Sequence, residues 1–172
     1  MDTKETLKSS VKKLLEEKDY SENVKGILKL ILDDKMYRSN VKIIFDSTAN
    51  KEGLKKELAN VILDHIGVCL EDGLITKEEL TMVKMLRLFF GIEEGDSFEL
   101  ELKPRIEQLL TIELEKTYDD KIINNEEALT KVELQELFGL CYENFYEIDK
   151  KVAQKAIKNG AEMKNLGSFF DL

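Results

Sequence analysis

Apolar residues recur along most of this chain at intervals of three and four, which places them on one face of an α-helix. Three short stripes of this kind fall within the first 50 residues: Leu7, Val11, Leu14 and Leu15; Val24, Ile27, Leu28, Ile31 and Leu32; Val41, Ile44 and Phe45. Asp2 and Ser21 stand where the N-caps of the first two helices would lie, and the third helix is expected from about Ser39. Short amphipathic helices need a partner surface, so we expect them to pack on the rest of the chain.

A longer helix is predicted from about Lys51 to Leu70. Its apolar positions at helical spacing are Leu54, Leu58, Val61, Ile62, Ile66, Cys69 and Leu70. The only histidine, His65, lies on the same face one turn before Cys69. A nucleophilic Cys–His pair needs an orienting group, and a zinc site usually needs three or four ligands. We therefore interpret His65 as a core or edge histidine, and Cys69 and Cys141 as reduced, buried thiols.

Two later stretches repeat the order bend, apolar helix, glycine. Residues 71–79 lead into a helix that stops at Gly91, with Thr76 and Glu79 spaced as a capping box. Residues 119–127 lead into a helix that stops at Gly139. Seven identities at one offset of 48 residues predict a duplicated helix-loop-helix unit. Asn124 with Glu127, or Thr130 with Glu133, can begin the second helix, so its start stays open by one turn.

The remaining segments complete an all-α prediction. An acidic loop is expected over residues 93–101, a helix with Pro104 in its first turn follows, and a last long helix is expected over about 143–158. The chain has one proline and no alternating strand segment bounded by hairpin turns. We predict a single all-α domain over residues 1–172, a compact bundle of about seven or eight short helices. In it, the helices of residues 1–50 pack on the duplicated unit of residues 51–172.

Charge is distributed unevenly along the chain. The net charge is −9, with 13 basic and 11 acidic residues in positions 1–60 but 13 basic and 24 acidic residues in positions 61–172. An acidic C-terminal part repels phosphate backbones, which disfavours nucleic acid, and attracts cations or a basic protein surface. No apolar run of membrane-spanning length occurs, so no membrane partner is expected. The charged N-terminus lacks a signal-type apolar segment, and we expect a cytoplasmic protein.

The two acidic bends are the candidate cation sites. Asp72, Glu78 and Glu79 in the first bend, and Asp120, Glu126 and Glu127 in the second, offer the oxygen ligands that hard divalent cations take. The first bend matches only the back half of an EF-hand loop, because Val68 and Leu70 stand where two acidic ligands belong. We reject a working EF-hand. If no metal binds, the two aspartates would form turns, and Glu79 and Glu127 would cap the helices that follow.

One family pattern fits the first bend. The residues Glu71-Asp72-Gly73, Ile75, Glu78-Glu79 and Leu86, with Phe89-Phe90-Gly91-Ile92, resemble the TerB-like helical domains of tellurite resistance. The resemblance covers about residues 55–140, with a weaker copy at 119–140. It implies an all-helical bundle, no known catalysis and an acidic face able to take divalent cations. Lys121 stands where the first copy has Gly73, which departs from a symmetric paired site.

The sequence favours binding over catalysis. It has one histidine, no nucleophile in an elbow motif and no phosphate-cradling glycine loop, so no catalytic residue is predicted. The leading hypothesis is a non-catalytic acidic module that binds a basic protein surface and needs no cofactor. Its most concrete form is a bacterial immunity protein that neutralises a toxin domain. The alternative is a TerB-like stress module holding a divalent cation at the acidic bends. The candidate partner contacts are Glu93, Glu94, Asp96, Glu99, Glu101, Tyr142 and Tyr146.

Overall fold

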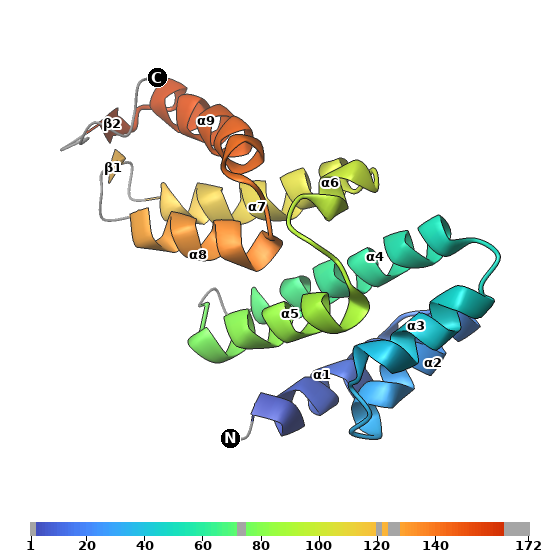
Figure 1. Ribbon diagram of the computed structural model, residues 1–172. Helices are drawn as coiled ribbons and strands as arrows, with labels where there is room; N and C mark the ends of the chain where they lie inside the picture. Colours follow the sequence, from blue (N-terminus) through green and yellow to red (C-terminus); the bar gives the residue numbers. More distant parts are fainter. Residues whose placement is uncertain (1–2, 72–74, 120–121, 124–127, 164–172) are drawn as a thin grey trace. The chain divides into compact units, whose positions relative to one another are not determined.

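The computed structural model describes residues 3–71, 75–119, 122–123 and 128–163, and this part of the chain is all-α apart from two strands of two residues each. The chain separates into two compact units, Met1–Leu102 and Lys103–Leu172. Figure 1 labels their helices and strands in chain order. None of the helices in the described ranges is long and apolar enough to cross a membrane.

The first unit is organised around its longest helix. Its elements are α1 (Thr3–Glu17), α2 (Glu22–Leu32), α3 (Arg38–Ser47), α4 (Lys51–Cys69), α5 (Lys77–Phe90) and α6 (Asp96–Glu99). Helix α4 packs against α1, α2, α3 and α5, so it is covered on several sides. Six of its apolar side chains are at most 2% exposed: Leu58, Ala59, Val61, Ile62, Leu63 and Ile66. A helix that is apolar around much of its circumference is stable only when buried in this way.

Two helix starts in the first unit, those of α2 and α5, follow the caps that the sequence predicts. The hydroxyl of Ser21 accepts the backbone N–H of Val24 at the start of α2. Thr76 and Glu79 form the predicted capping box, since each side chain accepts the backbone N–H of the other residue. These bonds satisfy N–H groups that have no partner inside the helix. The expected cap at Asp2 lies outside the described residues.

The helix that stops at Gly91 and the helix that stops at Gly139 end in the same way. Gly91 has φ +72° and Gly139 has φ +61°, the left-handed conformation that glycine adopts most readily. The N–H of Ile92 bonds to the carbonyl of Arg87, and the N–H of Leu140 bonds to that of Gln135. The two bonds join residues that correspond to each other at the offset of 48 residues. Each is the longer of the two hydrogen bonds that define a Schellman motif at a helix C-terminus. Whether the whole helix-loop-helix unit is duplicated stays a prediction, because part of the second bend lies outside the described residues.

The acidic segment after α5 contains a short helix that the sequence did not predict. Helix α6 follows Gly95, whose φ is +84°. The Asp96 carboxylate accepts the backbone N–H of Glu93 at 2.6 Å, and Ser97, Leu100 and Leu102 are buried. The expectation of a loop over residues 93–101 was therefore wrong in part, because apolar anchors among the acidic residues tie the segment down.

The second unit is built on α7. Its elements are α7 (Lys103–Thr117), β1 (Ile122–Ile123), α8 (Ala128–Phe138), α9 (Tyr142–Lys158) and β2 (Glu162–Met163). Both α8 and α9 pack against α7, and β1 pairs with β2 in parallel. Helix α8 already contains Thr130, so the alternative start at Thr130 and Glu133 does not begin it, while the other possible start, at Asn124 and Glu127, lies outside the described residues. The short strand pair had no signal in the sequence, since two residues are too few to show alternation.

The N-terminal helices of the first unit pack on α4 and α5. Helices α1 and α2 pack on α4, while α1 and α3 pack on α5. The second half of the predicted duplicated unit belongs to the other compact unit. The prediction of one domain over residues 1–172 stays a prediction.

Candidate partner-binding site

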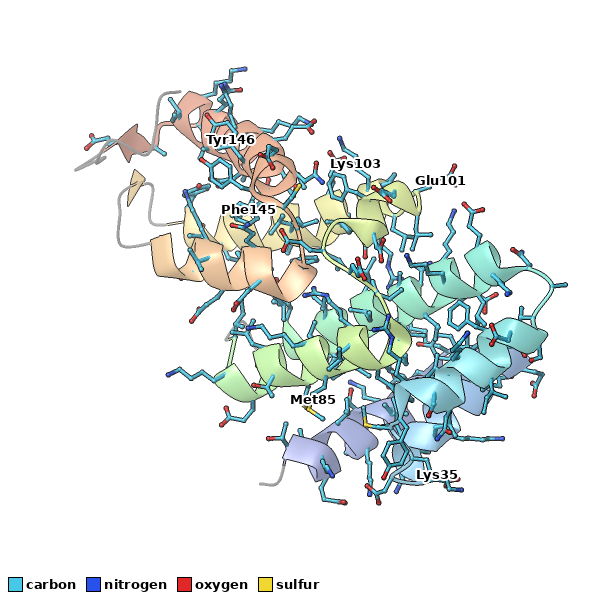
Figure 2. All side chains as sticks on the ribbon, in the orientation of Figure 1. Lys35, Met85, Glu101, Lys103, Phe145 and Tyr146 are labelled. Carbon is cyan, nitrogen blue, oxygen red and sulfur yellow. The ribbon has the colours of Figure 1, made fainter. Side chains whose placement is uncertain are left out.

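Two tyrosines form a stacked pair on the first turns of α9. The rings of Tyr142 and Tyr146 are 5.8 Å apart between centroids, with an interplanar angle of 18°. They meet because positions four apart lie above one another on a helix. Tyr142 is 55% exposed, and Figure 2 labels Tyr146 on the same helix, next to buried Phe145. Stacking fixes the rings, so a partner would meet aromatic surface that is already ordered.

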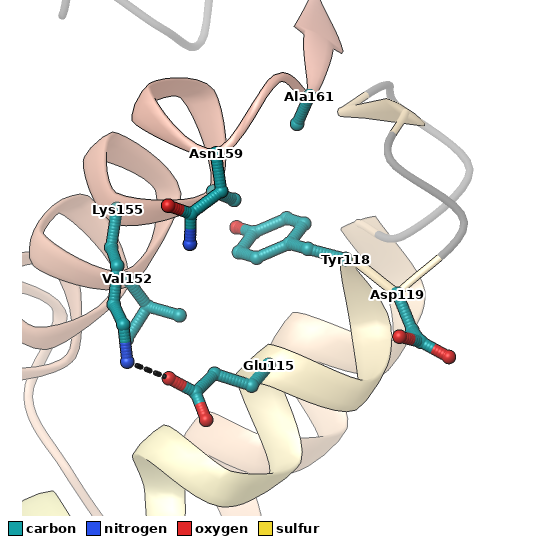
Figure 3. Close-up of a pocket in the computed structure, with 8 residues that line it drawn as sticks. Glu115, Tyr118, Asp119, Val152, Lys155, Asn159 and Ala161 are labelled. Atoms are coloured by element: carbon teal, nitrogen blue, oxygen red, sulfur yellow. Dashed lines mark hydrogen bonds and ion pairs between the residues drawn. The ribbon is translucent and has the colours of Figure 1, made fainter.

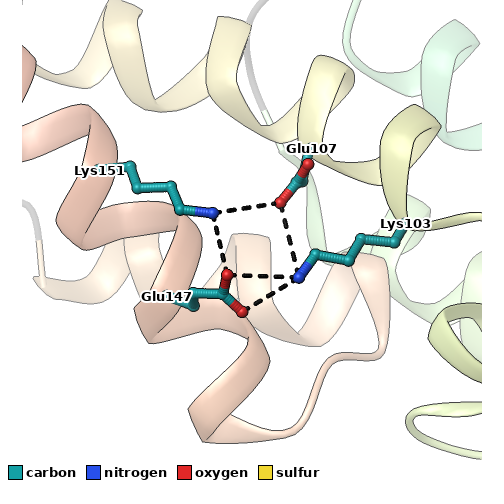
Figure 4. Close-up of polar contacts among 4 residues, drawn as sticks. All are labelled: Lys103, Glu107, Glu147 and Lys151. Atoms are coloured by element: carbon teal, nitrogen blue, oxygen red, sulfur yellow. Dashed lines mark hydrogen bonds and ion pairs between the residues drawn. The ribbon is translucent and has the colours of Figure 1, made fainter.

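Charges of both signs surround the tyrosine pair. The ammonium of Lys150 lies 5.8 Å from the centroid of the Tyr146 ring, within cation–π range. Glu147 bonds to Lys103 at 3.2 Å and to Lys151 at 2.9 Å, and both lysines also approach Glu107 (Figure 4). The hydrogen bond from Lys151, and then that from Lys103, lowers the pKa of the Glu147 carboxyl. This network joins α7 to α9.

The carboxylates predicted as partner contacts after α5 divide into two groups. Asp96 forms an ion pair with Lys55 at 2.8 Å, and Glu101, labelled in Figure 2, forms one with Lys56 at 2.9 Å. The hydrogen bond from Lys56 lowers the pKa of Glu101. These two side chains stabilise the segment against α4. The other three, Glu93, Glu94 and Glu99, are exposed.

The predicted contacts therefore come from two compact units. The acidic segment belongs to the first unit, and the tyrosine pair belongs to the second. Within the second unit, the structure brings Tyr142 and Tyr146 together. The sequence did not indicate their stacking or the position of Lys150 over the Tyr146 ring, although the spacing of four residues was the available signal.

The candidate metal ligands are described only in part. Glu78 is exposed, and one carboxylate oxygen of Glu79 accepts both the N–H and the hydroxyl of Thr76 at 2.8 Å. Glu79 thus acts as a helix cap. Asp72, Asp120, Glu126 and Glu127 lie outside the described residues. In the ranges that the structure covers, no group of three or more potential ligands is close enough to hold a metal ion.

His65 occupies the core, as the sequence predicts. It is 1% exposed, its Nδ1 lies 2.7 Å from the Ser10 hydroxyl of α1, and its Nε2 lies 3.7 Å from the Cys69 thiol. Burial lowers its pKa to about 4, so the ring is neutral near pH 7. Ser10 is the orienting group that sequence reasoning missed. Cys69 is only 4% exposed, so this row of side chains holds α1 to α4 and gives a substrate no access.

A buried charged cluster in the second unit was also missed. The Tyr118 hydroxyl donates to Asp149 at 2.5 Å, and Lys131 lies 3.2 Å from the other Asp149 oxygen and 5.0 Å from the centroid of the Tyr118 ring. All three side chains are at most 8% exposed. The signal was present, because Lys131 and Asp149 interrupt the apolar stripes of α8 and α9 with opposite charges.

Tyr118 also lines a cavity of about 330 Å³ between the last turns of α7 and α9 (Figure 3). Lys155 and Glu115 form an ion pair of 2.6 Å at its edge, and Asn159 and Ala161 close another side. We assign no ligand to this cavity.

A second cavity, in the first unit, is more apolar and wider. It holds about 540 Å³ between α3, the start of α4 and the end of α5. Val41, Phe89 and Phe90 form its floor and are at most 3% exposed. The sequence placed Val41 on an apolar helical stripe, but it did not indicate that basic residues of α3 and α4 would gather around these side chains.

The chain was compared with protein-family models, curated proteins and solved structures, and none of the three comparisons gives a match. The resemblance to TerB-like domains therefore gains no support, and no family is assigned.

Proposed function

We propose that this chain is a non-catalytic protein-binding module whose main anchor is the stacked pair of Tyr142 and Tyr146. The observation that supports this proposal is that the two rings stack on each other while Tyr142 stays 55% exposed. An exposed ring that is held in one conformation, as Tyr142 is by the half-buried Tyr146, loses little entropy on binding, and tyrosine is over-represented among residues that dominate interface energy.

The charge of the chain sets the class of partner. The net charge of −9 favours encounter with a basic protein surface, mainly by raising the association rate. Exposed Glu93, Glu94 and Glu99 add to this attraction from the first unit. Asp96, Glu101 and Glu147 contribute less, because lysines of the same chain already neutralise them. The most concrete form of the proposal is an immunity protein that neutralises a toxin domain by covering its basic surface.

The test uses the product of the gene adjacent to the one encoding this chain. The two proteins are co-expressed and purified together, and affinity is measured by calorimetry at low and at physiological salt. We expect a complex that weakens with salt, and a loss of affinity of at least about tenfold, or 1.4 kcal/mol, in Tyr142→Ala.

Val132→Ala is the matched control, because Val132 is 58% exposed on another helix of the same unit. It should bind as the wild type does. Equal affinity in wild type and Tyr142→Ala would overturn the proposed anchor. A complex insensitive to salt would overturn the electrostatic part.

A further inference from the structure

The wider cavity of the first unit is an apolar groove with a basic rim, which is unusual for a chain of net charge −9. Its walls carry four cations, Arg38, Lys42, Lys51 and Lys55, and one carboxylate, Asp46. Helix α3 supplies Arg38, Lys42 and Asp46, while the first turns of α4 supply Lys51 and Lys55. Folding thus gathers positive charge around a floor of buried aromatic rings.

The chain neutralises this rim only in part. Asp46 is shared between Lys42 at 3.0 Å and Lys51 at 3.8 Å, and the hydrogen bond from Lys42 lowers its pKa. Lys55 pairs with Asp96 at 2.8 Å. Four cations therefore face two carboxylates. No carboxylate among the described residues pairs with Arg38.

Arg38 stands where the groove meets the end of α5. A Cβ added to Gly91 would lie 3.2 Å from the Arg38 guanidinium, so this side chain passes close over the left-handed residue that ends the helix. The carbonyl end of α5 favours a cation at that place. The guanidinium keeps donors for a carboxylate, which it binds with two parallel hydrogen bonds when geometry allows.

We propose that this groove binds an acidic segment of a partner protein that inserts an aromatic or aliphatic side chain between carboxylates. The volume is within the range of pockets that enclose a ligand, and the floor of Val41, Phe89 and Phe90 matches an apolar anchor. The surplus of cations around the groove would attract carboxylates that flank this apolar anchor in the partner. The acidic partner proposed here is opposite in charge to the basic partner proposed for the tyrosine pair, and this proposal does not rest on that pair.

The test measures fluorescence anisotropy of a labelled synthetic peptide, Phe-Leu flanked on both sides by Glu, with the full chain. We expect saturable binding that weakens by at least about tenfold in Arg38→Glu, and likewise in Lys51→Glu. Lys12→Glu is the matched control, because it makes the same change of charge at an exposed position of α1. It should bind as the wild type does, as should Tyr142→Ala. Circular dichroism verifies that each variant is folded.

Two further peptides test the chemistry of the occupant. Replacing Glu by Gln removes the charges, and replacing Phe-Leu by Ala-Ala removes the anchor; each change should lower the affinity. The proposal is overturned by absence of saturable binding, by a Gln peptide that binds equally well, or by equal losses in Arg38→Glu and Lys12→Glu. Sedimentation showing that the wild type self-associates and Arg38→Glu does not would instead assign the groove to a second copy of this chain.

Discussion

Two polar side chains are buried deep in the protein, His65 in the first unit and Asp149 in the second. Each is at most 4% exposed and each has named partners inside the protein. Burial penalises a charge, so His65 stays neutral, whereas Asp149 lies beside a cation. The two sites therefore predict different consequences of protonation and of substitution.

Lowering the pH should destabilise the protein through His65. Its folded pKa of about 4 lies below the ordinary value of 6.5, so its contribution is fully present above pH 6.5 and is lost as pH falls towards 4. We expect a loss of about 2 kcal/mol in the free energy of unfolding between about pH 7 and about pH 5, where carboxyl groups contribute little. Urea unfolding at these two pH values measures it.

His65→Gln is the control for this dependence of the unfolding free energy on pH, because glutamine is polar and cannot titrate in this range. The variant should be less stable at neutral pH but lose much less stability on acidification. Since His65 is the only histidine, an unchanged slope in the variant would contradict the assignment.

Removing the charge of Asp149 should cost more than any exposed substitution. Asp149→Asn leaves the Lys131 ammonium buried beside an uncharged amide, and we expect a loss of about 3–5 kcal/mol in the free energy of unfolding. Adding Lys131→Met removes the stranded charge and should restore much of that loss. Glu147→Gln, on the exposed ion-pair network, should give no comparable change. A small loss in Asp149→Asn by urea unfolding would contradict the role of the cluster.

At the scale of elements, backbone conformation decides where α5 and α8 end. Gly91 and Gly139 take positive φ, and the buried residues that follow them, Ile92 and Leu140, fix the turn by packing. Pattern reasoning predicted both endings, since a glycine directly after an apolar helical stripe is the usual signal.

Substituting alanine for glycine should therefore have opposite effects at two positions of the first unit. Gly91→Ala forces a Cβ into the left-handed region and should cost about 1–2 kcal/mol. Gly67→Ala, inside α4 with open space around the new methyl group, should stabilise by up to about 1 kcal/mol. Thermal unfolding of the two variants measures both changes, and a shift of the same sign in both would contradict the conformational argument.

At the scale of the whole molecule, the two compact units hold separate cores. The first is centred on α4, and the second is built from α7, α8 and α9. A unit with its own buried core is the structural requirement for independent folding.

We expect residues 1–102, produced alone, to fold. Their helices bury α4 on several sides without any residue of the second unit being needed for the contacts described above. Circular dichroism should show a helical fragment that unfolds cooperatively in urea. A fragment that lacks helical signal, or that melts without a transition, would favour the single domain that the sequence predicts.

The sequence by itself determined what depends on neighbours along the chain: the helical class, most helix bounds, the capping box at Thr76, the glycine endings and the place of His65 on an apolar helix face. These follow from spacing, capping and backbone conformation, which act over a few residues. Only the tertiary structure decided what depends on residues far apart in the chain: Ser10 beside His65, Lys131 beside Asp149, the lysines that neutralise Asp96 and Glu101, and the cations around the groove floor. Their interactions join separate helices, and no periodicity in one helix records which face of another it will meet.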